Sequence, residues 1–182
     1  MTQKKHYPFL DVALDIFFSV VLYNYFITFP GFNMRALFLA FSLVVVLNYW
    51  WLARSYSVLP KYYLFDLYFV AAIVFIFAQW SYYFNDIGGY LLTLATLFLV
   101  DAIYSFLSVY AHKEKRDEPS LRSFFISEIL IAIIYFVVYA YARDFTWQVL
   151  MAIAIPYALL LWQMFRTKIF KTEFFDNDNQ PY

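Results

Sequence analysis

The chain has 182 residues, of which 64% are hydrophobic and 14% are charged, and its formal net charge is zero. Soluble domains carry about 45–50% apolar and about 25% charged residues, so a water-soluble globule of this composition would expose aggregation-prone apolar surface. The neutral charge and the lack of a basic patch exclude a nucleic-acid partner. The absence of cysteine excludes disulfides and Cys-ligated metals.

Six apolar segments are each long enough to cross a hydrocarbon core of about 30 Å as a helix. Lipid cannot form hydrogen bonds with backbone amides and carbonyls, so a spanning segment must be a helix or a strand of a closed barrel. No alternating barrel pattern is present, which leaves the helix. The sequence therefore predicts an all-α, polytopic membrane protein with six transmembrane helices in an up-down bundle. The predicted spans are Pro8–Thr28, Met34–Ala53, Tyr62–Tyr83, Ile87–Ala111, Ser120–Tyr141 and Phe145–Met164.

The connections between these segments contain recognisable helix-breaking residues. Pro30-Gly31 ends the first segment, Pro60 lies in the second connection, and Asn85-Asp86 precedes the fourth segment. All five connections are short, so we expect neighbouring helices to be antiparallel.

The positions of Lys and Arg predict the orientation. Of the 13 Lys and Arg residues, all but Arg35 and Arg143 fall on one side of the predicted membrane. Basic residues concentrate on the cytoplasmic side, so both termini are expected in the cytoplasm, with the protein in a plasma or inner membrane. Residues 1–167 then form the six-helix transmembrane domain, and residues 168–182 form a polar cytoplasmic tail.

Acidic residues inside the predicted spans are the strongest pointer to function. Asp15, Asp66, Asp101 and Glu128 lie in four different spans, all toward the cytoplasmic half. An acid near the bilayer centre costs about 2.5–3.5 kcal/mol on insertion scales, and such residues usually face a bundle interior or a wet cavity. We expect them to form a layer of carboxylates.

Helical spacing predicts that three spans carry a polar stripe facing the interior, because residues three or four apart share a helix face. The three stripes are Asp11, Asp15, Ser19 and Tyr23; Asp101, Ser105 and Ser108; and Glu128, Tyr135 and Tyr139.

Two interpretations of the acids remain open. In the first they form an ion or proton site or pore, because clustered carboxyls in low dielectric retain protons that a cation can replace. Arg54 is then a possible charge partner, and no metal centre is expected. In the second the acids form a polar core that holds the helices together. The candidate site residues are Asp11, Asp15, Ser19, Asp66, Asp101 and Glu128.

Many aromatic residues fall near the ends of the predicted spans. Tyr49-Trp50-Trp51 and Trp80-Ser81-Tyr82-Tyr83 are the clearest runs. We interpret most of them as an interfacial aromatic belt.

The stretch Lys5-His6-Tyr7-Pro8-Phe9-Leu10-Asp11, with Ser19 and Trp50, resembles the bacterial and endolysosomal six-helix potassium-channel family. That family opens with Arg-x-x-x-Phe-Ser-Asp, so Lys replaces Arg and Leu replaces Ser here, and its second-helix His is absent. The resemblance implies an oligomer around a pore lined by the first helix. It makes Lys5, Phe9 and Asp11 a packing and gating nest, with Phe18, Val21 and Leu22 as a hydrophobic constriction.

The segment 10–18, with acids four residues apart at Asp11 and Asp15, also resembles the opening helix of the low-temperature-requirement A family. Tyr49-Trp50-Trp51 is similar to the aromatic second helix of that family. Its members are about twice as long, so the resemblance implies that this chain matches one half.

The favoured function is a membrane cation channel or a small proton- or ion-coupled transporter, assembled as a homo-oligomer. Its expected partners are membrane lipids and a monovalent cation or proton. The alternative is a membrane-embedded accessory subunit with structural carboxylates, which recruits a partner through His112–Arg122 or Glu173–Asp178. No nucleophile triad, metal motif or phosphate loop indicates an enzyme or a cofactor.

Overall fold

The structure is a computed structural model that describes residues 8–55, 71–80, 86–111 and 119–166. Every regular element in these ranges is a helix, so the predicted all-α class is confirmed. The labelled helices are α1 (Pro8–Ile27), α2 (Met34–Ser55), α4 (Ile87–Ala111), α5 (Pro119–Tyr141) and α6 (Trp147–Arg166). A further helical segment covers Ala71–Trp80.

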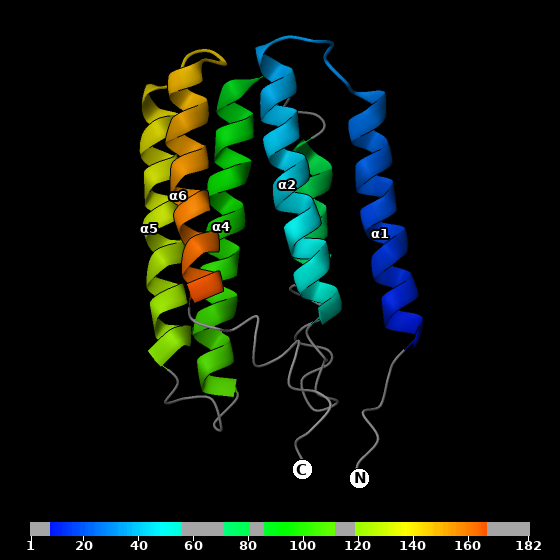
Figure 1. The fold of residues 1–182 in the computed structure, drawn as a ribbon, viewed down its shortest axis with the longest axis vertical. Helices are drawn as coiled ribbons and strands as arrows, with labels where there is room; N and C mark the ends of the chain where they lie inside the picture. The colour runs from blue at the N-terminus through cyan, green and yellow to red at the C-terminus, as the bar shows by residue number, and fades with distance from the viewer. Residues whose placement is uncertain (1–7, 56–70, 81–85, 112–118, 167–182) are drawn as a thin grey trace.

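The five labelled helices lie side by side, with α1 and α5 running in one direction and α2, α4 and α6 in the other (Figure 1). Helix α4 packs most extensively against α5, and α6 packs against both α5 and α2. Helix α1 lies at the edge of the bundle beside α2 (Figure 1). The start of α1 and the end of α6 therefore lie at the same end of the bundle.

Each helix buries one face, and its buried residues follow the helical repeat. The buried face of α2 carries Phe38, Ser42, Val45 and Tyr49, spaced at three or four residues. Helix α6 repeats this spacing with Leu150, Ile153, Tyr157, Leu160 and Met164. These stripes meet in one core, and that core determines which polar side chains lie inside the bundle.

One end of the bundle is held by side-chain caps at three helix starts. Asp86 accepts hydrogen bonds from the backbone amides of Gly88 and Gly89 at the start of α4, at 3.0 and 3.1 Å. Asn33 accepts from the amide of Arg35 at the start of α2, and Thr146 accepts from the amide of Val149 at the start of α6. Each cap satisfies a donor that the helix leaves open.

The outside of the bundle is strongly apolar. Large exposed side chains occur on every labelled helix, for example Phe26 on α1, Val137 on α5 and Trp162 on α6. Two helical stretches are long and apolar enough to cross a membrane, Ile87–Leu107 and Trp147–Met164. The other apolar stretches of the described chain are shorter: Asp15–Ile27, Met34–Trp50, Ala71–Trp80 and Phe125–Tyr141.

Two residues of the predicted interfacial belt lie in the core of the bundle. Tyr49 and Trp80 are buried in the core, at 8% and 0% exposure, and Trp50 donates a hydrogen bond to Asp15 at 2.9 Å. Aromatic side chains thus contribute to the interior of this bundle, whose chain has only three glycines for close helix contacts.

Candidate functional site: a buried carboxyl pair

Asp101 of α4 and Glu128 of α5 meet inside the bundle. Their carboxyl groups lie close enough to interact with each other. Glu128 is 6% exposed, and Asp101 is partly buried. Both lie about 15 Å along the helix axis from the same end of the α4–α5 pair. The structure therefore brings together two of the four acids of the expected carboxylate layer.

Hydroxyl groups from neighbouring helices surround the pair. The Tyr49 hydroxyl of α2 donates to Asp101 Oδ2 at 2.5 Å, and Ser105, one turn beyond Asp101 on α4, contacts the Glu128 carboxyl. Ser105 thus follows the predicted stripe of α4. On the stripe of α5, Tyr135 is buried but Tyr139 is 40% exposed, so the stripe turns outward beyond Tyr135.

Oε2 of Glu128 is buried and has no hydrogen-bond partner in the described chain. The hydroxyl of Tyr157 on α6 is also buried, and it interacts with the side chain of Asn48 of α2. Buried polar atoms are satisfied in the great majority of cases, and an unsatisfied one indicates an additional water, ion or functional role.

The contact between two carboxyls has a chemical consequence. An ionised carboxylate only accepts hydrogen bonds, so a hydrogen bond between Asp101 and Glu128 requires a proton on one of them. The basic side chains that the structure describes are Arg35 and Arg143, at the opposite end of the helices. Arg35 lies about 21 Å along α2 from Tyr49. Neither of these two described arginines lies near the pair.

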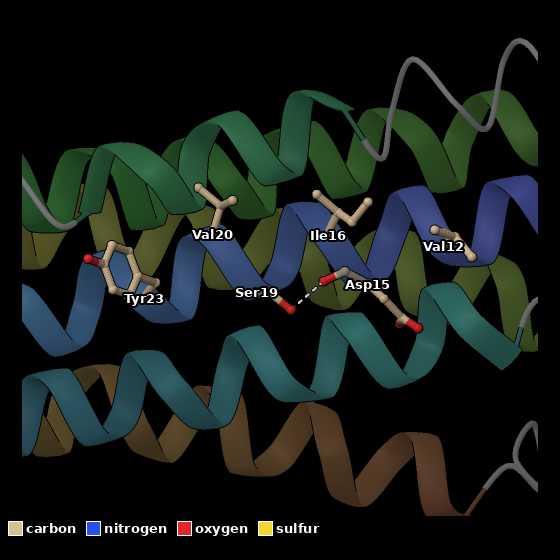
Figure 2. A pocket seen from close by; sticks show the side chains of 6 residues that line it. All are labelled: Val12, Asp15, Ile16, Ser19, Val20 and Tyr23. Carbon is tan, nitrogen blue, oxygen red and sulfur yellow. Dashed lines mark hydrogen bonds between the residues drawn. The ribbon is translucent and has the colours of Figure 1, made fainter.

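Asp15 occupies a different place, at the contact between α1 and α2. Its carboxylate accepts the hydrogen bond from Trp50, and its backbone carbonyl accepts the Ser19 hydroxyl at 2.6 Å. Figure 2 shows both residues on one face of α1, with the Asp15 side chain directed toward α2. This face forms an open groove of about 420 Å³, lined by Val12, Asp15, Ile16, Ser19, Val20 and Tyr23.

The prediction that the polar stripe of α1 faces the bundle interior is wrong. Ser19 is exposed and Tyr23 is 65% exposed, whereas Phe18, Val21 and Tyr25 form the buried face of the helix. In an apolar setting, Ser19 satisfies its hydroxyl within its own helix, so the stripe does not need a partner inside the bundle.

Some candidate residues lie outside the described residues. Asp66 falls in a range that the structure does not describe. Asp11 and Arg54 belong to α1 and α2, but their side chains are not described. Their assignment to the site stays a prediction, as does recruitment of a partner through His112–Arg122 or Glu173–Asp178.

A column of aromatic rings lies between the pair and the capped end of the bundle. Tyr49 contacts Phe77, Phe77 contacts Trp80, and Trp80 contacts Tyr90, with ring centroids 5.2–5.8 Å apart. The column continues through Phe38 to Phe145, over which Arg35 stacks at 5.5 Å. These rings, from Tyr49 to Phe38, are at most 8% exposed.

Comparison with known proteins finds no match, whether to a family model, to a curated protein or to a solved structure. The two family resemblances of the first helices therefore stay predictions. Of the implied constriction, Phe18 and Val21 are buried inside this chain, and Phe18 packs against Phe77.

Sequence reasoning missed Tyr49 and Tyr157 as members of the site. The signal for Tyr49 was present, because it stands seven residues after Ser42 on the buried face of α2. Tyr157 gave no such signal, since α6 carries no acidic residue.

Proposed function

We propose that this protein is a six-span membrane protein that moves protons or monovalent cations, and that the Asp101–Glu128 pair is the site through which they pass. The observation that carries the proposal is the contact between two buried carboxyls contributed by different helices. Such acids are costly in a bilayer and mark ion pathways and proton relays.

The surface of the bundle supports a membrane location. Exposed Phe, Ile, Leu and Val side chains cover the outer faces of all the labelled helices, where a soluble protein would place charged residues. Two helical hydroxyls outside the core, those of Ser19 and Thr96, bond to a carbonyl four residues earlier. Lipid offers such hydroxyls no other partner. A location in a plasma or inner membrane, with both termini cytoplasmic, follows the bias of Lys and Arg.

The packing of the pair favours a coupled transporter over an open pore. Tyr49 is hydrogen-bonded to Asp101, Glu128 is buried, and the aromatic column packs against Tyr49 on the side of the capped end. A continuous channel needs a polar or hydrated path. In a homo-oligomer, each chain would then carry its own site.

The proposal is tested by flux through proteoliposomes that contain the purified full-length protein, with proton, sodium and potassium gradients applied in turn. We expect flux of at least one cation, and we expect Glu128→Gln or Asp101→Asn to lower it at least tenfold, because a neutral amide can neither carry the proton nor bind the cation. Asp144→Asn is the matched control, since Asp144 is an exposed acid in the connection between α5 and α6.

Full flux in both Glu128→Gln and Asp101→Asn would mean that the pair is structural, and the proposal would fail. Loss of flux in Asp15→Asn alone, with both pair variants active, would also contradict it and would place the site on α1. Absence of flux under every gradient would remove transport altogether and leave the accessory-subunit interpretation.

A further inference from the structure

We propose that residues 157–166 of α6 form a gate, hinged at Pro156, whose outward movement gives water access to Glu128. This inference rests on the proposed function and adds how its site is reached. The structure shows the gate closed, since Glu128 is only 6% exposed. Transporters reach a buried site by moving one part of the fold relative to another.

The hinge lies where a proline interrupts the hydrogen bonds of α6. Pro156 stands inside this helix and has no backbone N–H, so the carbonyl of Ala152, four residues earlier, loses its helical donor. Tyr135 of α5 donates its hydroxyl to the next carbonyl, that of Ile153, at 2.7 Å. Neighbouring helices make a proline tolerable in a membrane by supplying such donors. The backbone of α6 is therefore least restrained at Pro156, and α5 holds it there.

A second hydrogen bond between α5 and α6 lies near the free end of the gate. The Ser127 hydroxyl donates to Oε1 of Gln163 at 2.7 Å. Ser127 directly precedes Glu128 on α5, and Gln163 is three residues from the end of α6. The two bonds to α5 thus flank Pro156 along α6. Loss of the bond at Gln163 would loosen the gate and leave the bond at the hinge intact.

The first residue of the gate packs into the core of the bundle. The Tyr157 ring contacts Phe41 of α2 and Phe98 of α4, with centroids 5.6 and 5.9 Å apart. Phe98 lies one turn before Asp101 on α4. The closed gate therefore joins α2 and α4 beside the layer that holds the carboxyl pair.

The gate has one buried face and one exposed face. Leu160 and Met164 point inward at 6% and 8% exposure, whereas Leu159 and Trp162 are 63% and 67% exposed. The described part of the chain therefore leaves room for an outward movement. In a membrane this movement replaces apolar protein contacts by lipid contacts of the same kind, so its cost in hydrophobic free energy is small.

Access of water to Glu128 can be measured by chemical labelling. Purified full-length protein in detergent is treated with a water-soluble carbodiimide, which couples carboxyl groups to an added amine, and mass spectrometry of peptides gives the rate at each acid. Asp144 is the internal standard, because it is exposed and lies outside any helix. We expect Glu128 to react slowly relative to Asp144, because the gate is closed most of the time.

The variant Ser127→Ala should raise the relative labelling rate of Glu128 about fivefold, since one hydrogen bond fewer holds the gate closed. Ser19→Ala is the matched control, because the Ser19 hydroxyl bonds within its own helix, to the carbonyl of Asp15. A rate for Ser127→Ala equal to that of the control would overturn the gate.

The hinge is tested by Pro156→Ala. Alanine restores the missing backbone donor to the carbonyl of Ala152 and makes the helix continuous. We expect the relative labelling rate of Glu128 to fall several-fold in this variant. An unchanged or higher rate would contradict a hinge at Pro156.

A reversible cross-link tests the movement within one protein. The chain contains no cysteine, so Ser127→Cys combined with Gln163→Cys can be bridged by a short bis-methanethiosulfonate reagent, and a reductant removes the bridge. The bridged protein should label Glu128 at least fivefold more slowly than the same sample after reduction, which controls for any folding defect of the double variant.

Equal labelling of Glu128 in the bridged and the reduced protein would overturn the gate, because water would then reach the site by another path. The proposed function fails separately. Full flux in Glu128→Gln would end it whatever the labelling shows, whereas pair-dependent flux with equal labelling would remove only the gate.

Discussion

A single hydroxyl connects α2 to the carboxyl pair. Tyr49 donates to Asp101 at 2.5 Å, while its ring packs against Phe77. The Tyr49 hydroxyl thus bonds to one carboxylate oxygen of Asp101, and the Asp101 carboxyl also interacts with Glu128. Tyr49 therefore orients Asp101 within the pair.

The substitution Tyr49→Phe tests this role. It keeps the ring contacts and removes the donor, so we expect a loss of about 1.5–3 kcal/mol in the free energy of unfolding, the usual contribution of a hydrogen bond to a charged group. Thermal unfolding in detergent would measure this change. Tyr141→Phe serves as control, because Tyr141 is 81% exposed at the end of α5. Equal stability of the two variants would mean that the Tyr49 hydroxyl does not stabilise Asp101.

At the scale of the helices, the caps determine where α2, α4 and α6 begin. Asp86 is the strongest of them, because both of its carboxylate oxygens accept backbone amides of α4. An ionised acid at this position also interacts favourably with the helix dipole.

Replacing Asp86 by Ala should lower the free energy of unfolding by about 1 kcal/mol, through the two amides that lose their acceptor. Asp101 lies far from the start of α4, so fraying of the first turn should leave it in place and flux should persist. Thermal unfolding and flux, measured together, check both parts. Asp144→Ala removes an exposed acid that lies outside any helix and should leave both quantities unchanged. A loss of flux without a loss of stability in Asp86→Ala would contradict the capping role.

Helix positions were predictable from the sequence, and helix rotations were only partly so. Apolar runs and breakers such as Pro30-Gly31 fix the ends of α1 and α2 within about two residues, close to the usual error of boundaries. The pair of Asp101 and Glu128 followed from spacing. The exposure of the polar stripe of α1 could not be predicted from spacing, because a polar face and a buried face repeat with the same helical period. Packing of α1 against α2 and residues 71–80 determines which face is buried.

At the scale of the whole molecule, the bundle has two chemically different ends. The capped end holds Arg35 and Arg143, and the sequence places the remaining Lys and Arg at the other end. Because the chain contains no cysteine, a single introduced cysteine can be labelled specifically, and its reactivity shows on which side of the membrane that end of the bundle lies.

We expect Phe32→Cys, in the connection between α1 and α2, to react with a membrane-impermeant maleimide applied outside intact cells. Phe32 is fully exposed. Asn179→Cys in the polar tail should react only after the membrane is opened, because the bias of basic residues places the tail in the cytoplasm. The unsubstituted chain is the background control. Reaction of both sites from one side would exclude the proposed orientation.

Under the proposed function, the aromatic column would limit the rate of proton transfer. A proton hops only between groups that both donate and accept, and within the column Phe77 and Phe38 do neither, while the Trp80 indole only donates. Proton transfer along the column would therefore stop at Phe77 unless the buried rings rearrange. Ring rearrangements in a close-packed interior are collective and slow compared with diffusion through an open pore. The turnover of this protein should accordingly rise steeply with temperature and stay far below the conductance of a water-filled pore.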